Sequence, residues 1–321
     1  MEFSGSTTAQ PSSNWVKDDQ VWLSDGNIVI IAQNSAFRVH KSILAQHSEV
    51  FRDIFSLPSS SVPEAVDGCE VVHVSDSAED MRQLLLVLCC GKNPYYDLDE
   101  IIPVPFPVVA SLVRMGHKYD VPGVLNPALA RLKKYYPITL KAWRDTDGRA
   151  RYVTSTDPHD AITAVQLARL TDTPSILPTA FLQCCDFADE VYPETHPQRG
   201  TFVLSAGLPP GDHATVISGQ VLATRIAAGF VARLFLEIPR PGCASPNQCK
   251  QAVKGGVIQE FASLSLAAGL RTGPAMSAAG SSAVICQTCR RVLSKASDGI
   301  WSILPHCFQV SIDGWPPIPT T

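Results

Sequence analysis

The stretch Asp25–Phe55, DGNIVIIAQNSAFRVHKSILAQHSEVFRDIF, contains the change of hydrophobic period that decides the fold of the first half. Residues 28–31 form a β-branched run between Asp-Gly-Asn and Gln-Asn-Ser, which is typical of a buried strand that ends in a turn. After this turn the apolar residues Phe37 and Val39 occur at every second position, which is typical of a strand. The two strands and the turn between them predict a hairpin. From Ser42 to Phe55 the apolar residues recur at helical spacing, which predicts a helix with one apolar face.

The chain that follows adds one strand and three helices. A third strand is predicted at Val71–Val74, and a helix over residues 78–90 with Asp76 or Ser77 as its N-cap and Gly91 as a left-handed C-cap. Two more helices are predicted before Pro137. These elements predict an α+β domain, a small sheet with a helical shell, over residues 19–138, after a flexible tail of residues 1–18.

The second half has a different composition, in which Ala, Leu, Pro and Gly dominate and strand signals nearly vanish. We expect an all-α domain over residues 139–321, with long connections at 190–208 and 267–282. The predicted helices are Ala161–Leu170, Ser175–Phe187, Asp212–Leu236, Asn247–Leu264 and Ala283–Leu304.

Overall composition excludes several classes of protein. Of 321 residues, 45% are hydrophobic and 17% charged, which is too apolar for a disordered chain. Residues 19–138 hold 10 basic and 14 acidic residues and residues 139–321 hold 15 and 14, so neither half has the excess of positive charge that binding to nucleic acid through phosphates requires. The polar N-terminus lacks the pattern of a secretory signal, and no apolar run is long enough to span a membrane. We therefore expect a cytoplasmic or nuclear protein with reduced cysteines and no membrane contact.

The opening stretch resembles the start of the BTB/POZ domain. That family has a strand, a turn, F-x-V-H-K and then L-x-x-x-S-x-x-F-x-x-x-F, and the residues in those places here are Phe37, Val39, His40, Lys41, Leu44, Ser48, Phe51 and Phe55. The segments Val71–Asp76, Met81–Gly91 and Leu112–Leu132 follow in the family's order. The Phe-Arg-Asp variant at 51–53 and the proline-rich segment 93–105 resemble a large BTB group of mushroom-forming fungi, in which a helical region follows the domain.

The resemblance implies an interaction protein. BTB domains commonly form homodimers, and many are substrate adaptors of cullin-RING ubiquitin ligases, so a second copy and a cullin are the expected partners. Asp25, Phe37, His40 and Lys41 are the candidate interaction residues, and His40 and Lys41 are expected to help line a recognition pocket at a dimer seam. For His40 the alternative is a structural imidazole that hydrogen-bonds backbone groups. The alternative function is a transcriptional or chromatin regulator that dimerises through the same domain.

No enzyme is expected. The sequence lacks the phosphate-binding loop, the dinucleotide fingerprint, His-Glu-x-x-His and Gly-x-Ser-x-Gly. Four aspartates at 145–160 do not follow the order of a calcium loop and are interpreted as a solvated linker. The expectation for cofactors is therefore none.

A zinc site formed by cysteines is the main alternative to a protein without a metal. Cys243-x5-Cys249 and Cys286-x2-Cys289 could supply four thiolates to zinc, with His306-Cys307 close behind in sequence. Because the second pair is predicted to open a helix rather than a knuckle, buried free thiols remain the default and no metal is predicted. A redox dithiol at Cys286 and Cys289 would need a preceding βαβ pattern, which this half lacks.

Overall fold

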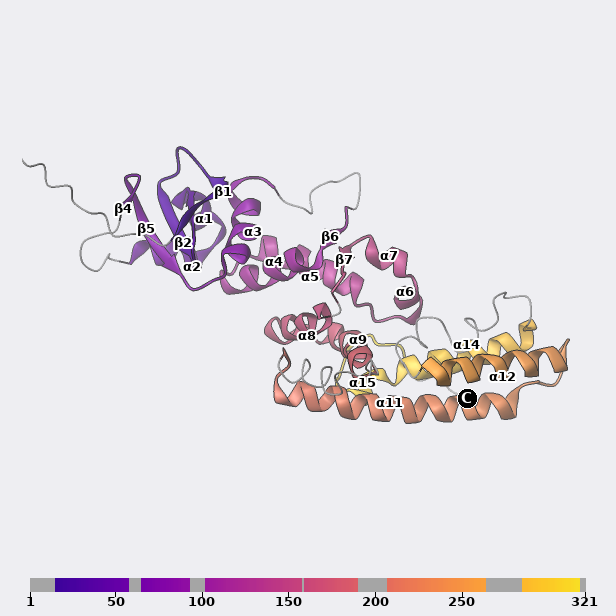
Figure 1. Cartoon of the computed structure of the whole chain (residues 1–321). Helices are drawn as coiled ribbons and strands as arrows, with labels where there is room; N and C mark the ends of the chain where they lie inside the picture. The colour runs from indigo at the N-terminus through magenta and orange to yellow at the C-terminus, as the bar shows by residue number, and fades with distance from the viewer. Residues whose placement is uncertain are drawn as a thin grey trace, which may run out of the picture. The chain divides into compact units, whose positions relative to one another are not determined.

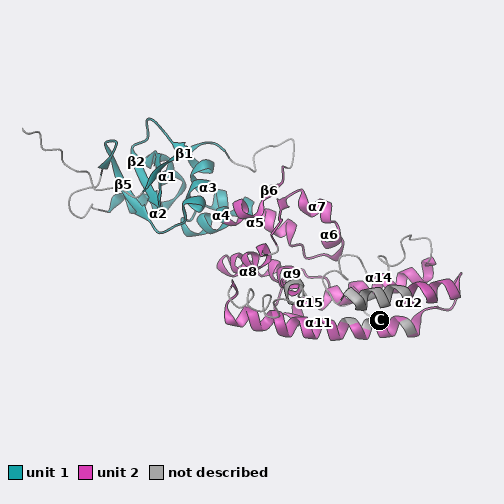
Figure 2. Ribbon diagram, viewed as in Figure 1, with its two compact units in different colours: residues 1–99, 111–128 teal, residues 100–110, 129–321 magenta. Residues whose placement is uncertain are grey.

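The computed structural model describes residues 15–57, 65–92, 102–157, 159–189, 207–263 and 285–317. The chain divides into two compact units (Figure 2). Unit 1 comprises residues 1–99 and 111–128, and unit 2 comprises residues 100–110 and 129–321. The division falls within two continuous helices, α4 (Phe106–Lys118) and α5 (Pro122–Tyr135), whereas the predicted boundary after residue 138 lies in the loop that follows α5.

Unit 1 is built on a five-stranded sheet with the order β1-β3-β2-β5-β4 (Figure 1). β2 is antiparallel to β3 and parallel to β5, and every residue of β2 is buried, as its β-branched run predicts. β1 pairs in parallel with β3 and is one edge of the sheet. The strands are β1 (Val16–Trp22), β2 (Ile28–Ala32), β3 (Ser35–Val39), β4 (Ala65–Val66) and β5 (Cys69–Val74).

The predicted tail of residues 1–18 is too long, because β1 begins at Val16. The Asp18 side chain anchors this strand: it accepts hydrogen bonds from the backbone N–H groups of Gln20 and Val21, both at 2.9 Å. Its other oxygen pairs with Arg82 at 2.7 Å. A buried carboxylate requires such partners, and they hold the start of the strand in unit 1.

The predicted single helix Ser42–Phe55 is broken in two at Ser48. α1 (Lys41–His47) ends there and α2 (Glu49–Ser56) begins, since Ser48 has extended backbone angles of φ −143° and ψ 122°. The Ser48 hydroxyl accepts a hydrogen bond from Phe51 N at 3.1 Å and donates one to the carbonyl of Tyr119. The buried hydroxyl thus serves as an N-cap and also connects α2 to the turn between α4 and α5.

Among the other elements of unit 1, α3 (Ala78–Cys89) and β5 follow the predicted boundaries closely, whereas the strands β1 and β4 were not predicted. α3 has Ser77 as its N-cap, which accepts from Asp80 N at 3.0 Å, and Gly91 adopts a φ of +64° just beyond the helix. Gly116 of α4 lies so close to α5 that an added Cβ would come within 2.9 Å of the Leu125 backbone nitrogen. These contacts fix the helical shell of the unit.

Unit 2 is largely helical, as predicted, and contains one additional strand pair. β6 (Val104–Pro105) and β7 (Val153–Thr154) form a two-residue parallel pair that the sequence did not indicate. The helical elements are α6 (Leu140–Arg144), α7 (Thr146–Ala150), α8 (Asp160–Leu170), a short 3-10 helix η1 (Pro174–Ile176), α9 (Leu177–Asp189), α11 (Pro210–Glu237), α12 (Pro246–Ser263), α14 (Gln287–Ser302) and α15 (Leu304–Cys307). The predicted long connections lie almost wholly outside the described residues.

The aspartates interpreted as a solvated linker have structural roles instead. Asp145 caps α7 by accepting a hydrogen bond from Gly148 N at 2.9 Å. Asp160, at the start of α8, is buried and accepts a hydrogen bond from Ser155 at 2.7 Å. The linker interpretation is therefore wrong for these two residues, because their carboxylates have backbone and hydroxyl partners.

The core of unit 2 contains several fully buried aromatic side chains. Trp301 of α14 lies 6.0 Å from Trp143 between ring centroids and donates its indole N–H to the carbonyl of Ile138 at 2.8 Å. Gly219 of α11 lies against Phe308, where an added Cβ would come within 2.3 Å of the ring. None of the helices in the described part of the chain combines the length and apolarity needed to cross a bilayer.

Candidate functional site

Three of the four candidate interaction residues lie together at the junction between β3 and α1. We call the set Asp25, His40, Lys41 and Glu70 the junction surface. The Nε2 atom of His40 lies 3.3 Å from an Asp25 oxygen, and the Lys41 ammonium pairs with Glu70 at 2.5 Å. The Asp25 side chain is 81% exposed and that of His40 is 25% exposed, so the pair is open to a partner.

The hairpin positions these side chains through backbone contacts. The backbone N–H of Lys41 donates to the Asn27 side chain at 2.8 Å, which fixes the start of α1 beside the start of β2. Gly26 lies directly over Arg38 and Val39, where an added Cβ would come within 2.9 Å of the Val39 carbonyl oxygen. Only glycine fits this close approach, so the loop that carries Asp25 is held against β3.

The fourth candidate, Phe37, has a different location. Its side chain is fully buried, and it faces Ile30 across the β2–β3 pair. It supports the junction surface from the core and offers no exposed atoms to a partner. The FxVHK pattern therefore combines two core residues, Phe37 and Val39, with the partly exposed residues His40 and Lys41.

The sequence interpretation missed two features of this region. Glu70 pairs with Lys41, and the only signal for it is the parallel register that brings β5 beside β2. The Ser48 hydroxyl bond to Tyr119 joins residues that are 71 positions apart. The Phe51 ring stacks on the Tyr119 ring, with centroids 4.2 Å apart, so the same two segments meet twice.

Apolar side chains are exposed elsewhere on unit 1. Among the described residues of this unit, the large hydrophobic residues with most exposure are Val16, at 71%, and Leu57, at 70%. Val16 opens the edge strand β1, and Leu57 directly follows α2. An edge strand presents unpaired backbone groups and can pair with another chain. Unit 1 therefore has polar, apolar and backbone groups available for a protein contact.

Unit 2 brings the four candidate cysteines together. The Sγ atoms of Cys243, Cys249, Cys286 and Cys289 all lie within 4.8 Å of one another. Cys243 precedes α12, and Cys249 lies in the first turn of α12. Cys286 is the residue before α14 and has extended backbone angles, so the prediction that it lies inside a helix is wrong. His306 and Cys307, in α15, are not members of this cluster.

The four thiols have different electrostatic environments. Backbone N–H groups of Cys289 and Ala244 lower the pKa of the Cys286 thiol to about 6. Burial raises the pKa of Cys249 and of Cys289, although each also accepts a backbone hydrogen bond. The cluster thus contains one thiol that ionises readily at neutral pH and two that are buried.

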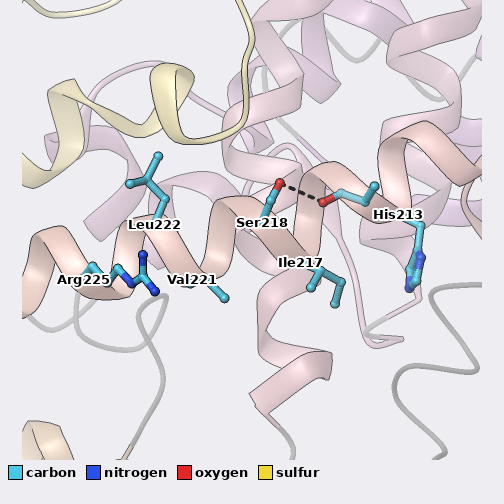
Figure 3. A pocket seen from close by; sticks show the side chains of 7 residues that line it. His213, Ile217, Ser218, Val221, Leu222 and Arg225 are labelled. Carbon is cyan, nitrogen blue, oxygen red and sulfur yellow. Dashed lines mark hydrogen bonds between the residues drawn. The ribbon is translucent and has the colours of Figure 1, made fainter.

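A third surface feature lies along α11. Figure 3 shows an open groove whose lining comes from this one helix, with Ile217, Val221 and Leu222 as its apolar part. His213 and Arg225 lie at its two ends, and the Ser218 hydroxyl is bonded to the Ala214 carbonyl of the same helix at 2.8 Å. The groove is a shallow helix face and brings no second element against these side chains.

Comparisons with known proteins identify the first part of the chain. A family model described as BTB/POZ domain matches residues 23–127. Neither the curated proteins nor the solved structures yield a match to the chain. The family match confirms the predicted resemblance to the BTB/POZ domain and the α+β class, and it does not test the resemblance to the fungal group. It includes the junction surface and the contacts between α2 and Tyr119, whereas the cysteine cluster lies outside it.

Proposed function

Residues 23–127 are a BTB/POZ domain, which makes this part of the chain a protein-interaction module, and we propose that the full chain acts as a homodimerising adaptor. The BTB/POZ match carries this proposal. Unit 1 would bind a second copy of the chain, and unit 2 would recognise another protein. In this proposal the chain has no catalytic step, and its domains are an interaction domain that begins with β1 at Val16 and ends near residue 138, and a helical domain over residues 139–321.

The exposed groups of unit 1 support self-association. β1 is an edge strand, and Val16 at its start is largely exposed, as is Leu57 beyond α2. A symmetric dimer uses the same surface on both copies, so each exposed apolar residue is buried twice. Full burial of one such side chain contributes roughly 1.5–3 kcal/mol, which is enough for a few residues to decide the association.

The junction surface supports specific recognition rather than the main binding energy. Exposed ion pairs contribute only about 0–1 kcal/mol each, but they select the partner and the orientation of the contact. Asp25 and His40, together with Lys41 and Glu70, present both signs of charge side by side. We propose that these side chains line the edge of the interaction surface.

The finer proposal is that the dimer is a substrate adaptor of a cullin-RING ubiquitin ligase. BTB domains of this class bind the N-terminal region of a cullin, and a second domain of the adaptor holds the substrate. The two-unit organisation of this chain supports such a division of tasks.

Light scattering of the full chain after size-exclusion chromatography tests the dimer. We expect the mass of a dimer at micromolar concentration. The dimer dissociation constant of a Val16→Glu/Leu57→Glu variant should be at least 10-fold higher than that of the wild type. The reason is that burying two carboxylates at the interface costs more than about 1.4 kcal/mol. Leu170→Glu is the matched control, since Leu170 of unit 2 is 44% exposed, and this variant should remain a dimer.

A strictly monomeric wild-type chain would contradict the proposal, as would equal dissociation of the control variant. The cullin step is tested separately, by a pull-down with a cullin N-terminal region. We expect binding that weakens in a His40→Ala/Lys41→Ala variant. A dimer that binds no cullin would remove the adaptor proposal but leave the dimer intact.

A further inference from the structure

Four cysteines from three separate parts of the sequence meet at one place in unit 2. Cys243 comes from the loop after α11, Cys249 from the first turn of α12, and Cys286 and Cys289 from the start of α14. The Sγ atom of Cys243 lies 3.5 Å from that of Cys286 and 3.6 Å from that of Cys289. The first turns of α12 and α14 meet at the cluster, where Val253 of α12 and Leu293 of α14 belong to the same apolar core.

These distances fit sulfur atoms that surround a common centre. Tetrahedral zinc has Zn–S bonds of about 2.3 Å, which places its sulfur ligands about 3.8 Å from one another. A disulfide needs two sulfur atoms about 2.05 Å apart. Two of the six sulfur–sulfur separations, 3.5 and 3.6 Å, are close to the edge of such a tetrahedron and too long for a bond, and all six are within 4.8 Å.

We propose that Cys243, Cys249, Cys286 and Cys289 bind one Zn²⁺ ion through four thiolates. Tetrahedral sulfur coordination is characteristic of zinc, and four protein ligands leave no position open for water or substrate. Cys249 and Cys289 are fully buried, so two ligands are shielded from solvent. The ion is therefore structural, and its binding releases the protons of the thiols.

The surroundings of the cluster stabilise the negative charge of the metal-bound thiolates. Four thiolates around Zn²⁺ carry a net charge of −2, and the N-terminal ends of α12 and α14 carry partial positive charge. The backbone N–H of Cys286 lies 3.4 Å from the Cys249 sulfur and donates to it. Such N–H groups solvate a thiolate inside the protein, where water has limited access.

The metal would join α11, α12 and α14, whose described residues share one apolar core. The cluster belongs to a small apolar core at the end of α11, formed with Leu234, Ile238, Val253, Ile285 and Leu293. Cys243 and Cys289 are 46 positions apart, so a shared ion closes a long loop of chain. Closing such a loop removes conformational entropy from the unfolded state and stabilises the folded one.

Metal analysis of the full chain tests the proposal. The protein is expressed with added zinc, purified under reducing conditions without chelator, and measured by inductively coupled plasma mass spectrometry. We expect about one zinc per chain. Cys286→Ser and Cys289→Ser should each lower the zinc content at least fivefold. Cys307→Ser is the control, because Cys307 is a buried cysteine of the same unit outside the cluster, and this variant should retain the ion.

Several results would overturn the proposal. These are a wild-type chain without zinc that also fails to take up added Zn²⁺ after reduction, iron in place of zinc, or equal loss of zinc from the Cys307→Ser control. A fourth is a disulfide among these cysteines in reduced, freshly purified protein, detected by mass spectrometry after alkylation of free thiols.

A second measurement keeps the test valid if the cysteine variants do not fold. The wild-type chain, freed of metal with a chelator, is titrated with Co²⁺ and followed by absorption. We expect the visible bands of tetrahedral cobalt bound to thiolates, with saturation near one ion per chain, and displacement by Zn²⁺. Hydrogen exchange in α12 and α14 should increase when the metal is removed and return with Zn²⁺, whereas exchange in β2 should not change. If hydrogen exchange in α12 and α14 is the same with and without the metal, the proposed structural role of the ion is wrong.

Discussion

In unit 1, a fully buried strand and two stacked rings make a core from segments whose roles follow from local patterns. In the cysteine region of unit 2, three helices meet around four sulfur atoms and a few aliphatic side chains. The first region resembles ordinary close packing, in which apolar burial supplies the stability. The second has a small apolar core, and small cores are often supplemented by a metal. The difference teaches that one chain can stabilise its interaction domain by apolar packing and, as we propose, its cysteine region by metal coordination.

The largest effect in unit 1 is expected from Phe51→Ala. Phe51 is fully buried and stacked on Tyr119, so its removal leaves a cavity and should cost about 3–5 kcal/mol. Hydrogen-exchange mass spectrometry of the full chain would show this loss in α1 and α2. Protection in α14 should stay as in the wild type. Equal loss of protection in α14 would contradict the independence of the two regions.

Ser48→Ala should have the next largest effect. The hydroxyl caps α2 and also donates to the Tyr119 carbonyl, so the variant loses a cap and leaves a buried carbonyl without its donor. We expect a destabilisation of about 2–3 kcal/mol from the two losses together. Urea unfolding with exchange detection in unit 1 measures it. A Ser48→Thr variant is the control, since it keeps a hydroxyl, and should restore part of the loss.

Ionisation of one aspartate in each unit should change the free energy of unfolding in opposite directions. Burial disfavours the charge of Asp80, but hydrogen bonds from Arg114 and Ser111 outweigh it and hold its pKa below the usual value. A lowered pKa in the folded state adds stability above about pH 4, and this stability is lost as the pH falls from there through the lowered pKa. Burial raises the pKa of Asp160, so its ionisation costs stability as the pH rises above about 4.

Two matched variants measure this contrast. Asp80→Asn should destabilise unit 1 at neutral pH and flatten its stability profile below about pH 4. Asp160→Asn should leave the stability of unit 2 at neutral pH unchanged or higher, because the buried charge is removed while an acceptor for Ser155 is kept. Unfolding of each unit, followed by exchange across this pH range, gives both profiles. An equal loss of stability in both variants at neutral pH would contradict the contrast between a stabilising charge at Asp80 and a destabilising charge at Asp160.

The smallest effect is expected from Asp145→Ala. Asp145 caps α7 as Ser48 caps α2, but its side chain is exposed, whereas the Ser48 hydroxyl is buried and also bonds to the Tyr119 carbonyl. We expect a loss of about 0.5–1 kcal/mol, compared with the larger loss at the buried cap. Exchange of the amides of α7 measures it. A loss as large as that of Ser48→Ala would show that burial does not explain the difference between the two caps.

Local patterns were sufficient to predict much of unit 1. The β-branched run predicted β2, Ser77 and Gly91 marked the ends of α3, and the FxVHK pattern placed the junction between β3 and α1. The break at Ser48 was not predicted, because the apolar spacing continues through it and the partner of its hydroxyl is Tyr119, far along the chain. The alternation at Phe37 and Val39 predicted the hairpin, but the candidate role of Phe37 as an interaction residue overlooked its burial against β2.

The cysteine cluster also depends on contacts between distant residues, which local sequence patterns do not reveal. The spacing of each pair made zinc a candidate, but the spacing alone does not tell whether the pairs meet. The predicted start of the last long helix, at residue 283, placed Cys286 within the helix and weakened the hypothesis. The helix begins at Gln287 instead, so Cys286 is in extended backbone and its sulfur reaches those of Cys243 and Cys249.

Native mass spectrometry of the full chain tests the central claim, that one part of the chain self-associates while the other holds a metal. The account predicts a dimer with one zinc per chain, which becomes a zinc-containing monomer in Val16→Glu/Leu57→Glu and a zinc-free dimer in Cys286→Ser. A wild-type monomer would contradict the proposed dimer, and a zinc-free wild-type dimer would contradict the metal site.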